Sequence, residues 1–388
     1  MEWTPYRIFL ALLLVVTGSI NTLSTKWADR MTSVGLDGES RPFVHPFLQA
    51  STMFLGEVAC LATFKLLYWY YSRRQDGSET REKTTSGNTN FRALILLPPA
   101  MCDMIATSTM YIGLNLTYAS SFQMLRGSVI VFVAILSIAF LDKKLRGVEW
   151  AGILFVISGL TVVGMSDFAS GSSQEHKDTN SIITGDLLIV AAQIITAFQM
   201  VYEEKFVKDK DIPALMAVGY EGFWGFVVLG SLLVPFYWIP AYPPFSANPR
   251  NVLEDTPDGL VQLYNNGFLL LAMLGTFVSI AFFNYAGVSV TKEMSATTRM
   301  VLDSVRTLVI WIVCLGLRWQ DFNYLQVVGF ALLLVGMCLY NNVFLEPTFK
   351  RIVGYMNRRA GMTGRHARLE EEEAGVLDNH EADKATTS

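Results

Sequence analysis

Residues 118–140 read YASSFQMLRGSVIVFVAILSIAF, and Arg126 is the single charged residue in this run. A helix that crosses a bilayer needs about 20 mostly apolar residues, so this stretch predicts a membrane span. Its apolar residues are continuous and do not alternate with a period of two, which favours a helix over a barrel strand. Comparable runs cover residues 6–26, 47–71, 92–113, 148–166, 184–204, 214–238, 267–290, 295–317 and 322–344. We therefore predict an all-α integral membrane protein with ten transmembrane helices.

The composition agrees with a membrane protein. Of the 388 residues, 52% are hydrophobic and 16% are charged, whereas soluble domains carry about 25% charged residues. The net charge of −4 is too small to indicate a nucleic-acid partner. The four cysteines lie inside apolar runs without a CxxC spacing, and the four histidines lie outside the runs. We therefore expect no disulfide framework, no metal site and no cofactor.

The loops between the runs differ in their basic residues, which collect on the cytosolic side of membrane proteins. The larger set lies in one series of alternate loops and comprises Arg73, Arg74, Arg81, Lys83, Lys143, Lys144, Arg146, Lys205, Lys208, Lys210 and Lys292. The other series holds Arg30, Arg41, Lys177, Arg250 and Arg318. This asymmetry predicts that both termini are cytosolic. The polar tail, residues 346–388, contains an acidic run and is predicted to be disordered.

Two local signals bear on this topology. Asn115-Leu116-Thr117 is an N-glycosylation sequon, and the loop charges place it on the lumenal side, so Asn115 is a candidate glycosylation site. The first run has an alternative interpretation as a signal peptide, because Arg7 precedes the apolar stretch and the small residues Gly18 and Ser19 follow it. Cleavage there would leave nine helices.

The chain also repeats itself at long range. One shift places Ala119-Ser120-Ser121 on Ala296-Thr297-Thr298 and Leu125 on Leu302. The same shift also aligns two pairs of glycines, Gly152 with Gly329 and Gly159 with Gly336. A shift three residues shorter aligns Tyr111, Gly113 and Thr117 with Tyr285, Gly287 and Thr291. The alternative is chance similarity between helices that contain glycine and serine.

Five helices followed by five equivalent helices must enter the membrane in opposite directions. The repeat therefore predicts two inverted halves, residues 5–166 and residues 184–345. Secondary transporters often have this architecture, with the substrate site near the membrane midplane between the halves. The paired glycines also predict close helix packing, because small residues let helix backbones approach each other in lipid.

Ionisable residues inside spans are costly, and they usually pair or line a polar cavity. The candidates are Glu57, Asp103, Arg126, Glu221, Arg299, Asp303 and Arg306. Arg126 and Asp303 occupy equivalent positions in the two halves and have opposite charge. A pair between them would join the halves at the substrate cavity.

Arg299, Asp303 and Arg306 share one helix face through their i, i+4, i+7 spacing. Arginine donates two parallel hydrogen bonds to phosphate, so this face is a candidate wall for binding an anion. Alternatively, Asp303 satisfies both arginines and the cluster only holds helices together.

The buried acids also have two interpretations. Glu57 and Glu221 lie in helices that the repeat relates, and such a pair could carry protons, or each could pair with an arginine. Asp103 follows Pro98-Pro99, which are expected to kink the third helix beside a cavity. Tyr111 and Tyr285 are candidate neutral hydrogen-bonding residues at the same site.

Several segments resemble one known group. Residues 119–127 (ASSFQMLRG), 292–304 (KEMSATTRMVLDS), 18–24 (GSINTLS) and 185–188 (GDLL) are similar to the drug/metabolite transporter superfamily, and within it to subfamily F of solute carrier family 35. The resemblance covers residues 5 to 345. It implies ten helices in two inverted repeats, cytosolic termini and alternating access without ATP. Better-known relatives exchange nucleotide sugars for nucleoside monophosphates in Golgi or ER membranes.

The same resemblance implies a lysosomal membrane, with the mitochondrion or the Golgi as alternatives. Relatives carry an acidic dileucine signal in the tail, and the nearest equivalent here is Glu372-x-x-x-Val376-Leu377, which departs from a Leu-Leu pair. No Arg-rich amphipathic presequence supports mitochondrial import.

Together these features predict a secondary transporter for an organic anion, such as a nucleotide sugar or another nucleotide-linked metabolite. The anionic substrate and the bilayer are the expected partners, with a membrane-protein partner or a homodimer as further candidates. One alternative is a transport-inactive membrane scaffold that affects organelle physiology. A membrane enzyme ranks last, because the sequence contains no nucleophile–base or metal-ligand constellation.

Overall fold

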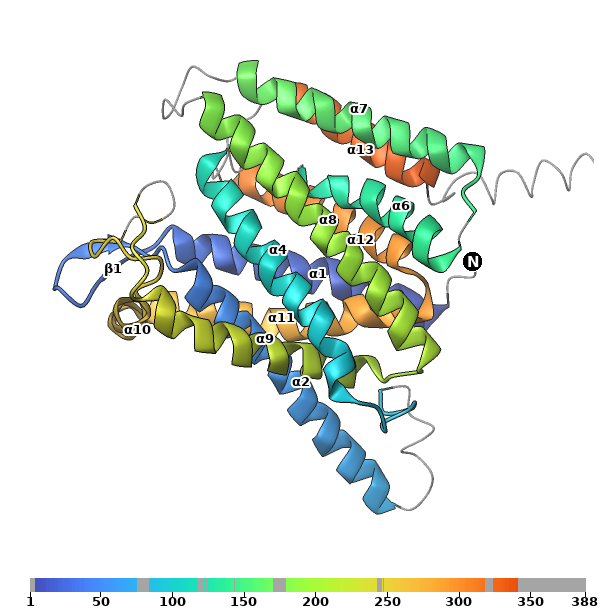
Figure 1. Ribbon diagram of the computed structural model, residues 1–388, viewed down its shortest axis with the longest axis horizontal. Helices are drawn as coiled ribbons and strands as arrows, with labels where there is room; N and C mark the ends of the chain where they lie inside the picture. The colour runs from blue at the N-terminus through green and yellow to red at the C-terminus, as the bar shows by residue number, and fades with distance from the viewer. Residues whose placement is uncertain are drawn as a thin grey trace, which may run out of the picture.

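Long apolar runs satisfy their backbone hydrogen bonds by coiling, and the chain is accordingly a bundle of α-helices (Figure 1). The computed structural model describes residues 4–74, 84–117, 122, 125–142, 144–169, 179–242, 246, 248–317 and 324–340. The helices are α1 (Pro5–Asp29), α2 (Pro46–Arg74), α4 (Leu97–Leu116), α6 (Val129–Leu141), α7 (Gly147–Ala169), α8 (Thr179–Asp209), α9 (Ala214–Phe236), α10 (Thr256–Asn265), α11 (Gly267–Glu293), α12 (Ala296–Gly316) and α13 (Tyr324–Tyr340). The 3-10 turns η1 (Ala93–Leu96) and η2 (Arg126–Ser128) precede α4 and α6.

Several of these helices have the dimensions of membrane spans. Within the described residues, six stretches are long and apolar enough to cross a bilayer: Pro5–Asp29, Pro46–Arg74, Ala93–Leu114, Asn180–Asp209, Ala214–Phe236 and Gly267–Glu293. Shorter apolar helices cover Arg126–Leu141, Gly147–Val162 and Val327–Tyr340. Length and composition therefore confirm the prediction of an all-α membrane protein.

Local sequence signals set where the helices begin. Ser295 caps α12 by accepting a hydrogen bond from the Thr298 N–H at 3.1 Å. Asn266 caps α11 by accepting from the N–H groups of Phe268 and Leu269. Such side chains satisfy backbone donors that the first helical turn leaves without partners.

The prolines of the third helix do not act as predicted. Pro98 and Pro99 lie in the first turn of α4, directly after η1, and not inside the helix. Proline is tolerated in a first turn because the N–H groups there have no intrahelical acceptor. The predicted kink is therefore replaced by a 3-10 turn that leads into a new helix start.

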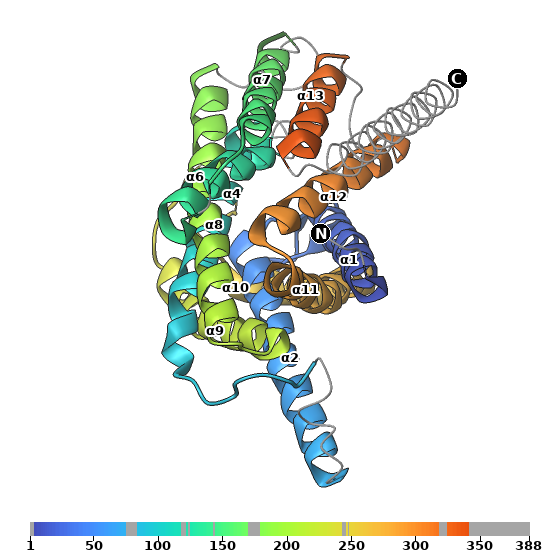
Figure 2. The same cartoon turned by 90° about the vertical axis from the view of Figure 1, so that its right-hand side faces the viewer.

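Helices from distant parts of the chain pack in antiparallel pairs. The closest pairs are α1 with α11, α2 with α9, α4 with α8, and α7 with α13, and Figure 2 shows α7 and α13 side by side at one end of the bundle. A Cβ added to Gly152 would lie 2.6 Å from the carbonyl oxygen of Gly336, and one on Gly159 would lie 2.7 Å from that of Gly329. Glycine thus permits the α7–α13 contact.

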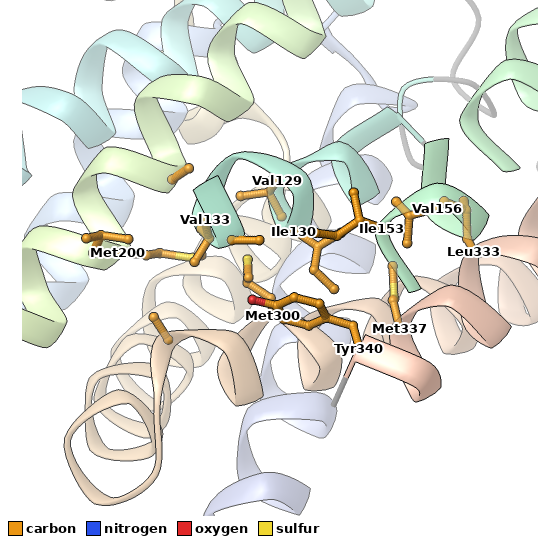
Figure 3. Packing of buried hydrophobic residues seen from close by; sticks show 14 of the residues in the cluster. Val129, Ile130, Val133, Ile153, Val156, Met200, Met300, Leu333, Met337 and Tyr340 are labelled. Atoms are coloured by element: carbon orange, nitrogen blue, oxygen red, sulfur yellow. The ribbon is translucent and has the colours of Figure 1, made fainter. Parts of the chain in front are cut away.

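An apolar cluster joins the same end of the bundle. Val133 of α6, Val156 of α7, Met200 of α8, Met300 of α12 and Leu333 of α13 are all buried in it (Figure 3). Residues on these five helices fill one continuous volume, so the cluster packs α12 against α6, α8 and α13.

The loops after α1 and α9 build a polar cap that the sequence did not predict. Strand β1 (Thr32–Val34) pairs antiparallel with β2 (Ser40–Pro42), and β1 lies beside α10 (Figure 1). Arg41 donates to Asp258 of α10 at 2.6 Å. Burial disfavours the charged carboxylate, but hydrogen bonds from Arg41 and the Leu36 N–H outweigh it and hold the pKa of Asp258 below its usual value.

Candidate functional site

A cavity of about 260 Å³ lies between helices from both halves of the sequence. Its wall comes from α1, α2, α4, α8, α9, α11 and α12, together with η2 and the start of α6. The basic residues that line it are Lys26, Arg126, Arg299 and Arg306. The acidic residues that line it are Asp29, Glu57, Asp103, Glu203, Glu221 and Asp303. A polar cavity inside a membrane bundle is the environment that such residues require.

Arg299 is committed to an ion pair. Its guanidinium lies 2.6 Å from a carboxylate oxygen of Glu203, and both side chains are buried, with 9% and 1% of their surface exposed. Gln199, one turn earlier on α8, donates to the other Glu203 oxygen at 2.9 Å. A Cβ on Gly287 would lie 2.9 Å from Arg299 Nε, so glycine at this place in α11 makes room for the arginine.

Arg306 has a different setting. One terminal nitrogen lies 2.9 Å from Asp303, three residues earlier on α12. The guanidinium lies over the Phe283 ring, 4.7 Å from its centroid, and a Cβ on Gly18 would lie 2.5 Å from Arg306 Cδ. Arg306 Nε is buried and has no hydrogen-bond partner among the described residues. Arg306 therefore keeps one unused donor in the wall of the cavity.

Of the three arginines in the cavity, Arg126 has the weakest interactions with other residues of the chain. It begins η2, and its guanidinium lies 5.9 Å from the centroid of the Phe122 ring. Within the part of the chain that the structure describes, it forms no ion pair and no hydrogen bond. An arginine without an anionic partner in a membrane cavity is costly to maintain unless a ligand or water satisfies it.

The acids of the other wall are held unequally. Glu57 of α2 accepts a hydrogen bond from the Asn284 amide of α11. Asp103 of α4 accepts a long bond of 3.4 Å from Thr107. Glu221 of α9 is 7% exposed, its Oε1 is buried, and it has no hydrogen-bond or ion-pair partner among the described residues.

The sequence matches the model of a family described as "Nucleotide-sugar transporter" over residues 7–218, which is more than half of the chain. The chain belongs to the nucleotide-sugar transporter family. This is a family of solute transporters and not of enzymes. The chain is 54% identical over 345 residues to "Solute carrier family 35 member F6" of Rattus norvegicus, with 88% of this chain and 90% of the relative covered. The relative of the same name in Mus musculus is 52% identical, with 92% and 93% covered.

More distant similarities agree with the family. The "UDP-N-acetylglucosamine/UDP-N-acetylgalactosamine transporter nstp-4" of Caenorhabditis elegans is 24% identical over 269 residues, which cover 66% of this chain and 75% of that protein. A solved crystal structure aligns over 88% of this chain and 98% of its own, with a TM-score of 0.55 and 13% identity. At that identity the match shows a shared fold.

The predicted site residues of this transporter-family chain fall into three groups. Glu57, Asp103, Arg126, Glu221, Arg299, Asp303 and Arg306 all line the same cavity. Tyr285 instead packs in apolar clusters between α11 and neighbouring helices. Tyr111 and Asn115 lie in α4, but their side chains are outside the described residues, so their predicted roles stay predictions.

The ion pairs in the cavity differ from both arrangements that the sequence predicted for Asp303. Asp303 binds Arg306 of its own helix, and no Arg126–Asp303 ion pair occurs among the described residues. Asp303 does not satisfy both arginines either, because Arg299 binds Glu203. Neither Glu57 nor Glu221 forms an ion pair with an arginine in the described part of the chain.

Several cavity residues were missed from the sequence. Glu203 lies near the end of the predicted run 184–204, but α8 continues to Asp209, so Glu203 is inside the helix. Lys26 is the last residue of the predicted run 6–26 and Asp29 lies beyond it, whereas α1 extends to Asp29. Asn284 is uncharged and therefore gave no signal in a search for buried charges.

Proposed function

We propose that this chain is a secondary-active transporter that moves an organic anion, such as a nucleotide sugar or another nucleotide-linked metabolite, by alternating access. One observation carries the proposal. The cavity contains Arg126, which forms no ion pair and no hydrogen bond among the described residues, and Arg306, whose buried Nε has no hydrogen-bond partner there. Guanidinium donors suit the oxygens of a phosphate or a carboxylate.

The arrangement of the helices supports two inverted halves, residues 5–166 and 184–345, and we expect a cytosolic tail, residues 346–388, to follow them. If α1 is equivalent to α8 and α4 to α11, the pair α1–α11 is equivalent to the pair α8–α4, and both pairs are present. The pairs α2–α9 and α7–α13 each join equivalent helices. In α7–α13, Gly152 meets Gly336 while Gly159 meets Gly329, as a two-fold axis requires.

This symmetry gives a route for transport. Helices of both halves line the cavity, so rocking one half against the other would open it to each side in turn. We also expect an endomembrane location, with the lysosomal membrane first and the mitochondrion or the Golgi as alternatives. The resemblance of the motifs supports this location, and the loop charges support cytosolic termini.

Ligand binding to Arg126 can be tested before transport is measured. Purified protein is heated in the presence of nucleoside monophosphates, nucleotide sugars or small organic dianions, and its unfolding is followed. A ligand at 100 times its Kd stabilises the folded state by about 2.7 kcal/mol. In Arg126→Gln the same ligand should give little stabilisation, because hydrogen bonds to charged groups contribute about 1.5–3 kcal/mol each.

The matched control is Arg92→Gln, which removes an exposed arginine outside the cavity. It should keep the stabilisation of the wild type. Equal stabilisation of wild type and Arg126→Gln by every anion that binds would remove Arg126 from the site.

A further inference from the structure

The charges that line the cavity do not balance. Six acidic residues face four basic ones, so full ionisation of all ten gives a net charge of −2. A cavity with that charge repels the anion that the proposed function requires. Either the substrate is not an anion, or protons enter the cavity with it.

The acids without strong partners gather on one wall. After Arg299 pairs with Glu203 and Arg306 with Asp303, four acids remain without an ion pair among the described residues: Asp29, Glu57, Asp103 and Glu221. Asp29 accepts a hydrogen bond from the Gln49 amide at 2.6 Å, which leaves Glu57, Asp103 and Glu221 as the candidates for a proton site. Glu57 and Glu221 come from the paired helices α2 and α9, and a Cβ added to Gly222 would lie 2.3 Å from Glu57 Cβ. The two glutamates therefore project from backbones that touch.

Glu221 is the least satisfied member of this group. The helices packed against α9 present Glu57 from α2 and Asp103 from α4, while α11 offers only the neutral amide of Asn284. Glu203 of α8 and Arg299 of α12 also interact with it electrostatically, but they bind each other. A buried carboxylate needs a cation or a hydrogen bond, and Glu221 Oε1 has neither among the described residues.

We infer that Glu221, together with Glu57, binds a proton that is transported with the substrate anion. The proton binds a carboxylate oxygen of Glu221, which removes one negative charge from the cavity as the anion pairs with Arg126. On the other side of the membrane the proton and the anion are both released, and Glu221 becomes a carboxylate again. This inference rests on the proposed function, because it names the ion whose gradient drives transport through the same cavity.

The proton site can be tested without a substrate. A protonated carboxyl group and a carboxylate have different C=O stretching bands, so infrared difference spectra between acidic and alkaline buffer detect the proton directly. The full-length protein in lipid should show the band of carboxyl groups shielded from water, weaker in Glu221→Gln and weaker still in Glu221→Gln/Glu57→Gln, where Asp29 and Asp103 remain. Glu39→Gln, an exposed residue of the hairpin loop, should leave the band unchanged. Identical spectra in the wild type and the double variant would overturn the proposal.

A transport assay then tests whether substrate uptake is coupled to proton movement. Uptake of uridine monophosphate into proteoliposomes is measured with an inward proton gradient, with an inward sodium gradient and with neither. One proton per substrate allows accumulation of about tenfold for each pH unit. The ratio of uptake with and without the proton gradient should fall to about one in Glu221→Gln, and in Glu57→Gln if the first variant is unstable.

The outcomes separate the two proposals. Uptake driven by sodium, or indifferent to both gradients in the wild type, would overturn proton coupling and leave the transporter intact. Absence of uptake of every anion under any gradient would overturn the proposed function, while the infrared spectra would still decide whether Glu221 binds a proton.

Discussion

Replacing Arg299 by alanine is expected to lower the free energy of unfolding by about 3–5 kcal/mol. The reason is that Glu203, which is 1% exposed, would keep its charge inside the bundle without a cation. Gln199 would remain as its single hydrogen-bond donor among the described residues. Thermal or denaturant unfolding of the purified protein in detergent measures the change.

A second substitution separates the lost ion pair from lost packing. In Arg299→Ala/Glu203→Gln the uncompensated charge is gone, so the double variant should be more stable than Arg299→Ala alone. If the effects of the two substitutions simply add, the pair contributes no coupling and the assignment is wrong. A loss of transport in Arg299→Ala alone is ambiguous for the same reason, which makes Arg126 the better probe of the substrate site.

The second large effect concerns the contact between α7 and α13. Gly152→Ala should destabilise the protein by about 1–3 kcal/mol, the usual effect of overpacking. The new Cβ would lie 2.6 Å from both the Gly336 carbonyl oxygen and the Tyr340 nitrogen, and these backbone atoms cannot move aside as a side chain can. The added methyl group would force the two helices apart.

Gly230→Ala is the matched control, because no atom beyond the neighbouring residues and backbone of α9 lies within 4 Å of the added Cβ. There alanine should stabilise the helix by about 0.5–1 kcal/mol, since it loses less conformational freedom than glycine. Unfolding temperatures of both variants give the comparison. Equal shifts in the same direction would show that the glycine contact does not hold the helices together.

The helices were predictable because burial in lipid forces a continuous apolar run to coil. The residues that line the cavity were predictable in part for the opposite reason: Glu57, Asp103 and Arg126 interrupt such runs at high cost, so each needs a polar surrounding. These two physical constraints act on single segments, and a sequence displays them directly.

Which residues of different segments pair with each other depends on where the helices end and on how they pack. These pairings were not predictable from the sequence. Glu203 lay beside Glu204 at the end of a predicted span and looked like the polar edge of a helix. In the structure Glu203 binds Arg299, whereas Glu204 accepts from the Ala296 N–H at the start of α12. The hairpin and α10 depend on Arg41 meeting Asp258, residues far apart in the chain.

The cavity and its unpaired arginine favour transport over a scaffold that has kept the fold and lost the activity. A scaffold has no need to keep a buried guanidinium without an ion pair among the described residues, since an apolar residue would cost less there. Measuring substrate transport by the purified protein tests directly whether it is a transporter or a scaffold.

The decisive measurement is uptake of nucleotide sugars, nucleoside monophosphates and small organic anions by proteoliposomes that contain the purified full-length chain. We expect saturable uptake of at least one of them by the wild type and by Arg92→Gln, and a loss of tenfold or more in Arg126→Gln, because 1.4 kcal/mol of lost binding is already tenfold. Uptake by the wild type no greater than by empty liposomes, for every anion, would contradict the account and favour the scaffold.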